Sequence, residues 1–135
     1  MATLGNITFL DLDLCEETVT IESNEVEVDI IDVEIKKEAD CAYAVVGGQI
    51  CYTITIENRS EVPFNDPAIG PGQLFFRDPL DENLEYVQGS FTVDGHQRTP
   101  TVTNNEISYH LDVPATSTVI VRFCVKVLSV PYSAV

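Results

Sequence analysis

The sequence predicts an all-β protein in which antiparallel strands form a sandwich. Apolar residues alternate with other residues in several segments, a period of two that is typical of strands with one face in a core. The strictest alternation places four apolar side chains on one face: Ile50, Tyr52, Ile54 and Ile56. Strand-like segments recur about every ten residues with turn residues between them, which indicates a sandwich. A helical period of 3.6 is not sustained anywhere in the chain.

The first third of the chain contains three predicted strand segments, which are Asn6–Leu14, Thr18–Glu22 and Glu25–Lys37. In Glu25–Lys37 the apolar alternation shifts by one residue at Ile30 and Ile31. Such a shift predicts either a β-bulge or a strand that changes partners at this point.

The rest of the chain continues the pattern of strands and turns. Ile50–Asn58 is followed by a Pro- and Gly-rich loop, Glu61–Gly72, and Asp94-Gly95 predicts a tight hairpin turn. In the last strand, Phe123 and its alternating valines point inward while Cys124 points outward. The other predicted strands are Gln73–Arg77, Leu84–Val87, Ser90–Val93, Thr101–Thr103, Glu106–Val113 and Thr118–Leu128.

An ordered set of short motifs runs through residues 31–128. Its members are Lys37, Gly48, Tyr52, Asn58, Asp78, Pro79, Leu80, Leu84, Tyr86, Val87, Gly89, Ser90 and Phe123. This set resembles the conserved-repeat domain called domain of unknown function eleven. The resemblance implies an immunoglobulin-like sandwich, usually one of many tandem repeats in large prokaryotic surface proteins. The chain departs from that pattern by having one copy, an N-terminal extension at residues 1–30 and a C-terminal tail at residues 129–135.

The charge distribution narrows the classes of partner. The formal net charge is −15, and residues 1–40 hold 12 acidic residues against Lys36 and Lys37. A field this negative repels nucleic acid and anionic lipid, so we expect neither as a partner. No apolar run approaches the ~18 residues of a membrane span, and no secretory signal is visible at the N-terminus.

The extension at residues 1–30 requires a partner sheet, because an isolated β-segment with an apolar face is not stable in water. Its apolar residues are Leu10, Leu12, Leu14, Val19 and Ile21. Donation to a neighbouring copy would give an open filament. The alternatives are that the extension completes the sheet of its own domain or is disordered.

The four cysteines, Cys15, Cys41, Cys51 and Cys124, fit no zinc-binding spacing, and an even number permits two disulfides. Alternation places Cys51 and Cys124 on outward faces, which suits bonds between subunits, particularly one that involves Cys15. The alternatives are local pairing, for example of Cys41 with Cys51, and free thiols.

Alternation places Ile31, Val33 and Ile35 on an inward face. It also places Lys37, Asn58 and Asp78 on inward faces at the ends of their strands. A buried lysine, asparagine and acid are the components of a spontaneous isopeptide crosslink, because burial favours the neutral amine. The favoured alternative is an ion pair between Lys37 and Asp78, with Asn58 shaping the turn that follows it.

Little in the sequence indicates a cofactor or catalysis. The acidic residues Asp11, Asp13, Glu16 and Glu17, or Asp29 with Asp32, could hold Ca²⁺, but no calcium-binding loop is present, so we expect no metal site. No serine or cysteine has the context of an activated nucleophile, so we expect that the protein is not an enzyme.

These observations together predict a structural protein. We expect a subunit of a self-assembling extracellular filament or surface layer, which polymerises with copies of itself by donating its N-terminal strand. The alternatives are a monomeric adhesive or binding module at the cell or spore surface, and an intracellular or spore-surface protein released without a signal.

Overall fold

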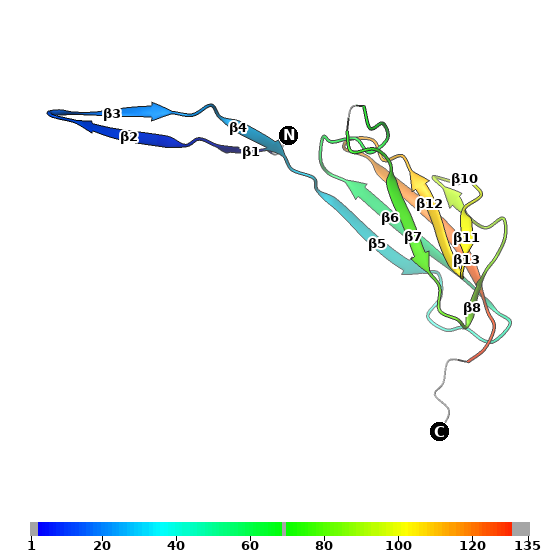
Figure 1. The fold of residues 1–135 in the computed structure, drawn as a ribbon. Helices are drawn as coiled ribbons and strands as arrows, with labels where there is room; N and C mark the ends of the chain where they lie inside the picture. Colours follow the sequence, from blue (N-terminus) through cyan, green and yellow to red (C-terminus); the bar gives the residue numbers. More distant parts are fainter. Residues whose placement is uncertain (1–2, 69, 131–135) are drawn as a thin grey trace, which may run out of the picture.

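The computed structural model describes residues 3–68 and 70–130, and the fold of these residues is all-β, as the sequence predicts. The strands are arranged in several antiparallel sheets (Figure 1). The body is built from two of them. The larger has the order β10-β9-β13-β6-β5, with β8 also paired to β13, and the smaller has the order β11-β12-β7.

The bounds of the body strands lie within two residues of the predicted ones, except that β5 begins eight residues after the predicted start at Glu25, and β10 was not predicted as a strand. They are β5 (Val33–Ala39), β6 (Gln49–Asn58), β7 (Leu74–Pro79), β8 (Leu84–Tyr86), β9 (Thr92–Val93), β10 (His96–Gln97), β11 (Thr101–Thr103), β12 (Glu106–Leu111) and β13 (Thr118–Val127).

The core lies between the two body sheets and is made by the inward faces of their strands. The alternation predicted for the last strand is confirmed, because Val119, Val121, Phe123 and Val125 of β13 are all buried. Phe76 of the smaller sheet packs edge-on against Phe123, with ring centroids 6.4 Å apart. This packing joins the two sheets at their centre, and aromatic pairs in this geometry stabilise a core beyond the area that they bury.

The predicted hairpin turn at Asp94-Gly95 joins β9 to β10. Both residues have positive φ, 51° for Asp94 and 82° for Gly95, which is the conformation of a type I′ turn. The Asp94 carboxylate also accepts a hydrogen bond from the backbone N–H of Ile120 at 2.8 Å, which ties the turn to β13.

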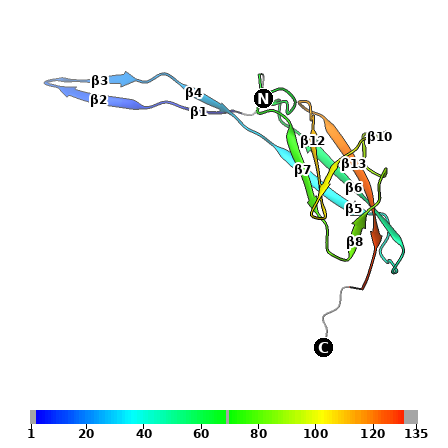
Figure 2. The ribbon, with the colours of Figure 1, turned by 45° about the vertical axis from the view of Figure 1, so that its right-hand side comes forward.

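The first four strands form a ribbon separate from the body. We call residues 3–29 the ribbon: β1 (Thr3–Asn6) pairs with β4 (Val26–Asp29), and β2 (Phe9–Leu14) pairs with β3 (Glu17–Glu22). The ribbon projects away from the body and joins it where β4 leads into β5, as both views of the molecule show (Figures 1 and 2).

The segment Glu25–Lys37 is therefore two strands that have different partners. β4 pairs with β1 inside the ribbon, whereas β5 pairs with β6 inside the body. The predicted change of partner near Ile30 and Ile31 is confirmed, and the bulge is not needed. The expectation of a single strand at Asn6–Leu14 is wrong, because the chain leaves the ladder at Ile7 and Thr8, where the backbone N–H of Thr8 donates to the Ser23 hydroxyl at 2.9 Å.

Candidate assembly surfaces

The outer half of the ribbon is strongly amphipathic. Register places Leu10 directly opposite Ile21 and Leu12 opposite Val19, so these side chains share one face, together with Leu14. On the other face, Asp11 and Asp13 accept hydrogen bonds from the hydroxyls of Thr20 and Thr18, each at 2.9 Å. The apolar face is open to solvent, with Leu10 66% and Leu12 50% exposed.

The inner half of the ribbon adds apolar residues that are not among the five predicted for assembly. Leu4 lies opposite Val28, and Val26 lies opposite Asn6. The segment between β3 and β4 has one residue more than the segment between β1 and β2, so the register shifts by one. This extra residue keeps Val26 and Val28 on the apolar face by strand parity. The alternation of Val26 with Val28 could have indicated these assembly residues, but in the sequence it is part of the predicted strand Glu25–Lys37, which enters the body.

A second uncovered apolar surface lies on the body, on β5. Val33 is paired with Asn58 and Ile35 with Ile56, so Val33 and Ile35 point to the core side of the sheet. Their partners on β6 are at most 4% exposed, whereas Val33 is 36% and Ile35 is 65% exposed. The sequence pattern placed Val33 and Ile35 on the inward face, and the opposite sheet does not extend far enough to cover them.

One disulfide forms, and it differs from the expectation of bonds between subunits at Cys51 and Cys124. These residues lie directly opposite each other on β6 and β13 and are bonded to each other, with Cα atoms 4.0 Å apart. The prediction failed because alternation gives the face of each cysteine but not the register that makes them neighbours. The local pairing of Cys41 with Cys51 is also wrong, because Cys41 and Cys15 are free and exposed.

The backbone around the disulfide is held by polar groups. The Asp40 carboxylate accepts a hydrogen bond from the Cys51 backbone N–H at 3.0 Å, and this bond holds the pKa of Asp40 below its usual value. Partial desolvation and the neighbouring Asp40 raise the pKa of the Cys41 thiol. Cys41 is therefore mostly protonated at neutral pH, which slows its reactions as a nucleophile. Cys15 sits at the turn of the ribbon with a φ of 26°.

The structure brings together only two members of the Lys37, Asn58 and Asp78 set. The Lys37 ammonium lies 2.8 Å from the Asp78 carboxylate and 4.4 Å from the centre of the Tyr52 ring. Asn58 lies opposite Val33, four positions along β5 from Lys37, and it is buried. The Asn58 amide nitrogen donates to the carbonyl oxygens of Val62 at 2.8 Å and Pro114 at 3.2 Å, which fixes the loop after β6.

The acidic residues of the ribbon are spread along its length. Within residues 3–68 and 70–130, no group of three or more His, Cys, Asp or Glu side chains is placed to hold a metal ion. Asp11 and Asp13 are engaged by threonines, as described above.

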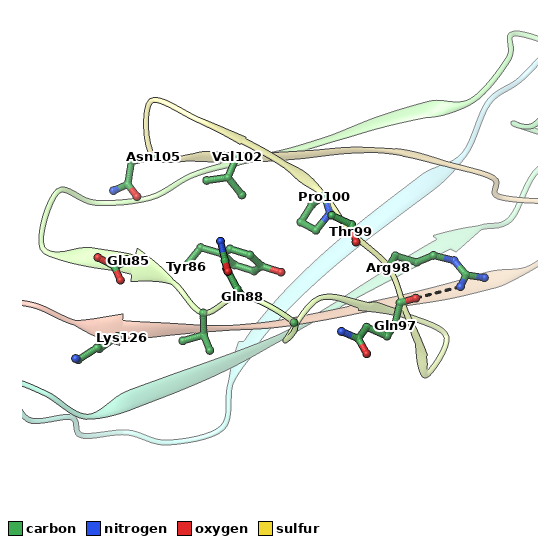
Figure 3. A pocket seen from close by; sticks show the side chains of 12 residues that line it. Glu85, Tyr86, Gln88, Gln97, Arg98, Thr99, Pro100, Val102, Asn105 and Lys126 are labelled. Atoms are coloured by element: carbon green, nitrogen blue, oxygen red, sulfur yellow. Dashed lines mark hydrogen bonds between the residues drawn. The ribbon is translucent and has the colours of Figure 1, made fainter.

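A hollow with a volume of about 1030 Å³ opens to solvent between β8 and the segment 97–105 (Figure 3). Tyr86 lies near its centre, while Glu85 and Lys126 lie at one end. The Arg98 guanidinium lies at the other end and donates to the Gln97 carbonyl oxygen at 3.1 Å. A hollow with one aromatic ring and charged groups at both ends can accept a polar ligand.

Comparison with known proteins leaves the site to be interpreted from its own geometry. No protein-family model, no curated protein and no solved structure matches this chain. Among the described residues, no helix is long and apolar enough to cross a membrane.

Proposed function

We propose that this chain is a structural subunit of a self-assembling extracellular filament or surface layer, and that it polymerises by donating its N-terminal ribbon to a neighbouring copy. The observation that carries this proposal is the open apolar face of Leu10, Leu12, Leu14, Val19 and Ile21. Exposed apolar surfaces of this kind mark interaction sites, and ribbon edges can extend a neighbour's sheet.

The apolar face supplies a driving force for association. Full burial of an apolar side chain of this size contributes about 1.5–3 kcal/mol, and these five are 38–66% exposed in the ribbon, so covering them contributes on the order of 5 kcal/mol before ordering costs. Association also loses translational, rotational and side-chain freedom. A preformed ribbon reduces the ordering cost, because its backbone is already paired within the donor.

The proposed location rests on two supports. The resemblance to the repeat domain of prokaryotic surface proteins implies an immunoglobulin-like body, and the antiparallel sandwich agrees with that architecture. The disulfide between Cys51 and Cys124 favours an oxidising compartment. We therefore place the subunit outside the cell, at the cell or spore surface, without a catalytic role.

Substitution on the apolar face tests the proposal. We expect the full-length chain to form polymers that electron microscopy and size-exclusion chromatography detect, and Leu12→Asp to remain monomeric. Val102→Asp is the matched control, because Val102 is an exposed apolar residue on β11, away from the ribbon. A wild-type chain that stays monomeric at high concentration would contradict the proposal, as would Leu12→Asp polymers of normal length.

The second candidate function is a monomeric surface module that binds a polar ligand in the hollow around Tyr86. It is favoured if the wild-type chain is monomeric and Tyr86→Ala abolishes binding to a glycan or to an immobilised host protein.

A further inference from the structure

The two body sheets have unequal widths. The path through the larger sheet contains five strands, whereas the smaller sheet contains three, β11-β12-β7. β7 is therefore the end strand of its sheet within the described residues, and one of its two backbone edges has no strand partner there. An unpaired edge presents free N–H and C=O groups to any strand that approaches it.

The smaller sheet ends at β7 on the side of the body where the apolar surface of β5 is uncovered. Lys37 near the end of β5 contacts Asp78 near the end of β7, so the two strands lie at the same side of the sandwich. Both strands run in the same direction (Figure 1), so Val33 and Ile35 lie toward the beginning of β7. The ion pair closes one end of this side, and the apolar face of β5 stays open along the rest of it.

We propose that the open side between β5 and β7 is the acceptor site for the ribbon of a second copy, an inference that rests on the proposed function above. β2 and β3 are joined by six residue pairs, and β7 is six residues long, so the outer ribbon matches the free edge in length. Two added strands bring the smaller sheet to five, equal to the path through the sheet that it faces.

The faces of the ribbon also match this position. A ribbon that extends the smaller sheet turns one face to β5 and the other to solvent. The leucine face then covers Val33 and Ile35, whereas Asp11 and Asp13 lie outward, on the same side of the sheet as Arg77, whose largely exposed side chain is paired with Glu106 at 3.2 Å. Addition to the free edge of β5 instead would widen the larger sheet and leave Val33 and Ile35 uncovered.

The donor is a second copy because the ribbon of the same chain leads away from this site (Figures 1 and 2). The connection between the ribbon and β5 is residues 30–32, and the backbone N–H of Arg59 donates to the Asp32 carbonyl oxygen at 2.8 Å. This bond continues the pairing of β5 with β6 to the base of the ribbon, and it restrains the direction in which the ribbon leaves the body.

Complementation between two variants tests the site. Ile35→Asp retains the ribbon and loses the acceptor, whereas Leu12→Asp retains the acceptor and loses the ribbon. We expect each variant alone to be monomeric, and a 1:1 mixture to form heterodimers of twice the 14.9 kDa subunit mass that do not grow further. Native mass spectrometry with one variant isotopically labelled identifies the heterodimer.

Two controls keep the result interpretable. Val102→Asp places the same charge on β11, at the opposite edge of the smaller sheet, and we expect it to polymerise like the wild type. Circular dichroism and an intact bond between Cys51 and Cys124 establish that Ile35→Asp is folded, and Ile35→Asn provides a second acceptor variant without added charge.

The outcomes separate the acceptor site from the proposed function. If wild type and both Ile35 variants all polymerise normally, the proposed function stands and the acceptor site is wrong. If Ile35→Asp and Leu12→Asp are each monomeric but their 1:1 mixture forms no heterodimer, the acceptor site is also wrong. If wild type itself stays monomeric, with the ribbon folded onto its own β7, donation between copies fails and both proposals are overturned.

Discussion

Removal of the disulfide should weaken the body strongly, although its two cysteines lie on neighbouring strands. The bond links residues 73 positions apart, from β6 to β13. In the unfolded chain it closes a loop of that length, and the loop-entropy relation then gives a stabilisation of about 4 kcal/mol. We expect Cys51→Ala with Cys124→Ala to lower the free energy of unfolding by roughly this amount.

Urea unfolding followed by tyrosine fluorescence measures the effect, since the chain has 5 Tyr and no Trp. The disulfide-bonded parent and the disulfide variant both carry Leu12→Asp, because polymerisation would otherwise make the free energy of unfolding depend on protein concentration. Cys15→Ser with Cys41→Ser is the matched control, because these thiols are exposed and unbonded, and we expect a change below about 0.5 kcal/mol. A loss below about 1 kcal/mol in the disulfide variant would refute the loop-entropy argument for this bond.

The remaining predictions concern the buried amide, the ion pair, the acidic residue beside the disulfide and the ribbon charge. Asn58→Ala should cost about 2–4 kcal/mol in urea unfolding, because it leaves the buried backbone N–H and hydroxyl of Ser60 without their acceptor and the Val62 carbonyl oxygen without its donor; a cost below 1 kcal/mol would contradict this. Lys37→Met should cost about 1–3 kcal/mol, because it leaves the Asp78 carboxylate, which is only 12% exposed, without its ion pair; intact mass should show no ammonia loss in the parent chain. The pKa of Asp40 is lowered in the folded state, so the stability that Asp40 contributes is present at neutral pH and is lost as the pH falls through that pKa. Asp40→Asn should therefore reduce the fall in the free energy of unfolding at acid pH; an unchanged fall would count against this role. Assembly followed by light scattering should accelerate from 10 to 150 mM NaCl, because the Debye length falls from about 30 to 8 Å and copies repel less; slower assembly with salt would indicate an attractive charge contact instead.

The all-β class and most strand positions could be predicted because alternation is a local property of the chain. Each buried residue of β13 was assigned to the correct face from its neighbours alone. The position of the hairpin turn at Asp94-Gly95 was also predictable, since Asp-Gly is one of the few dipeptides that favour positive φ at two successive positions. The second such turn, at Asn104-Asn105 between β11 and β12, carries no glycine and was not predicted. These features need no knowledge of what lies on the far side of a sheet.

Register and coverage were not predictable in the same way, because both depend on residues distant in the sequence. Alternation places Cys51 and Cys124 on outward faces, yet both are buried, and only the pairing of β6 with β13 makes them neighbours. Ile35 was assigned to the inward face correctly, yet its exposure depends on the width of the opposite sheet. Alternation specifies a face, and it does not specify whether anything covers that face.

The acidic face of the ribbon gives a physical reason why an exposed apolar ribbon can exist in solution. A flat apolar strand pair with free edges tends to pair indiscriminately with other strands. Here Asp11 and Asp13 line the opposite face, so two ribbons that pair edge to edge bring like charges together, whereas the acidic faces stay apart when the leucine faces stack. Charge repulsion thus disfavours edge-to-edge pairing of ribbons, while the proposed site between β5 and β7 offers both an apolar surface and a free edge. The same ribbon can therefore be poor at pairing with itself and well matched to the body of another copy, which is the selectivity that ordered polymerisation requires.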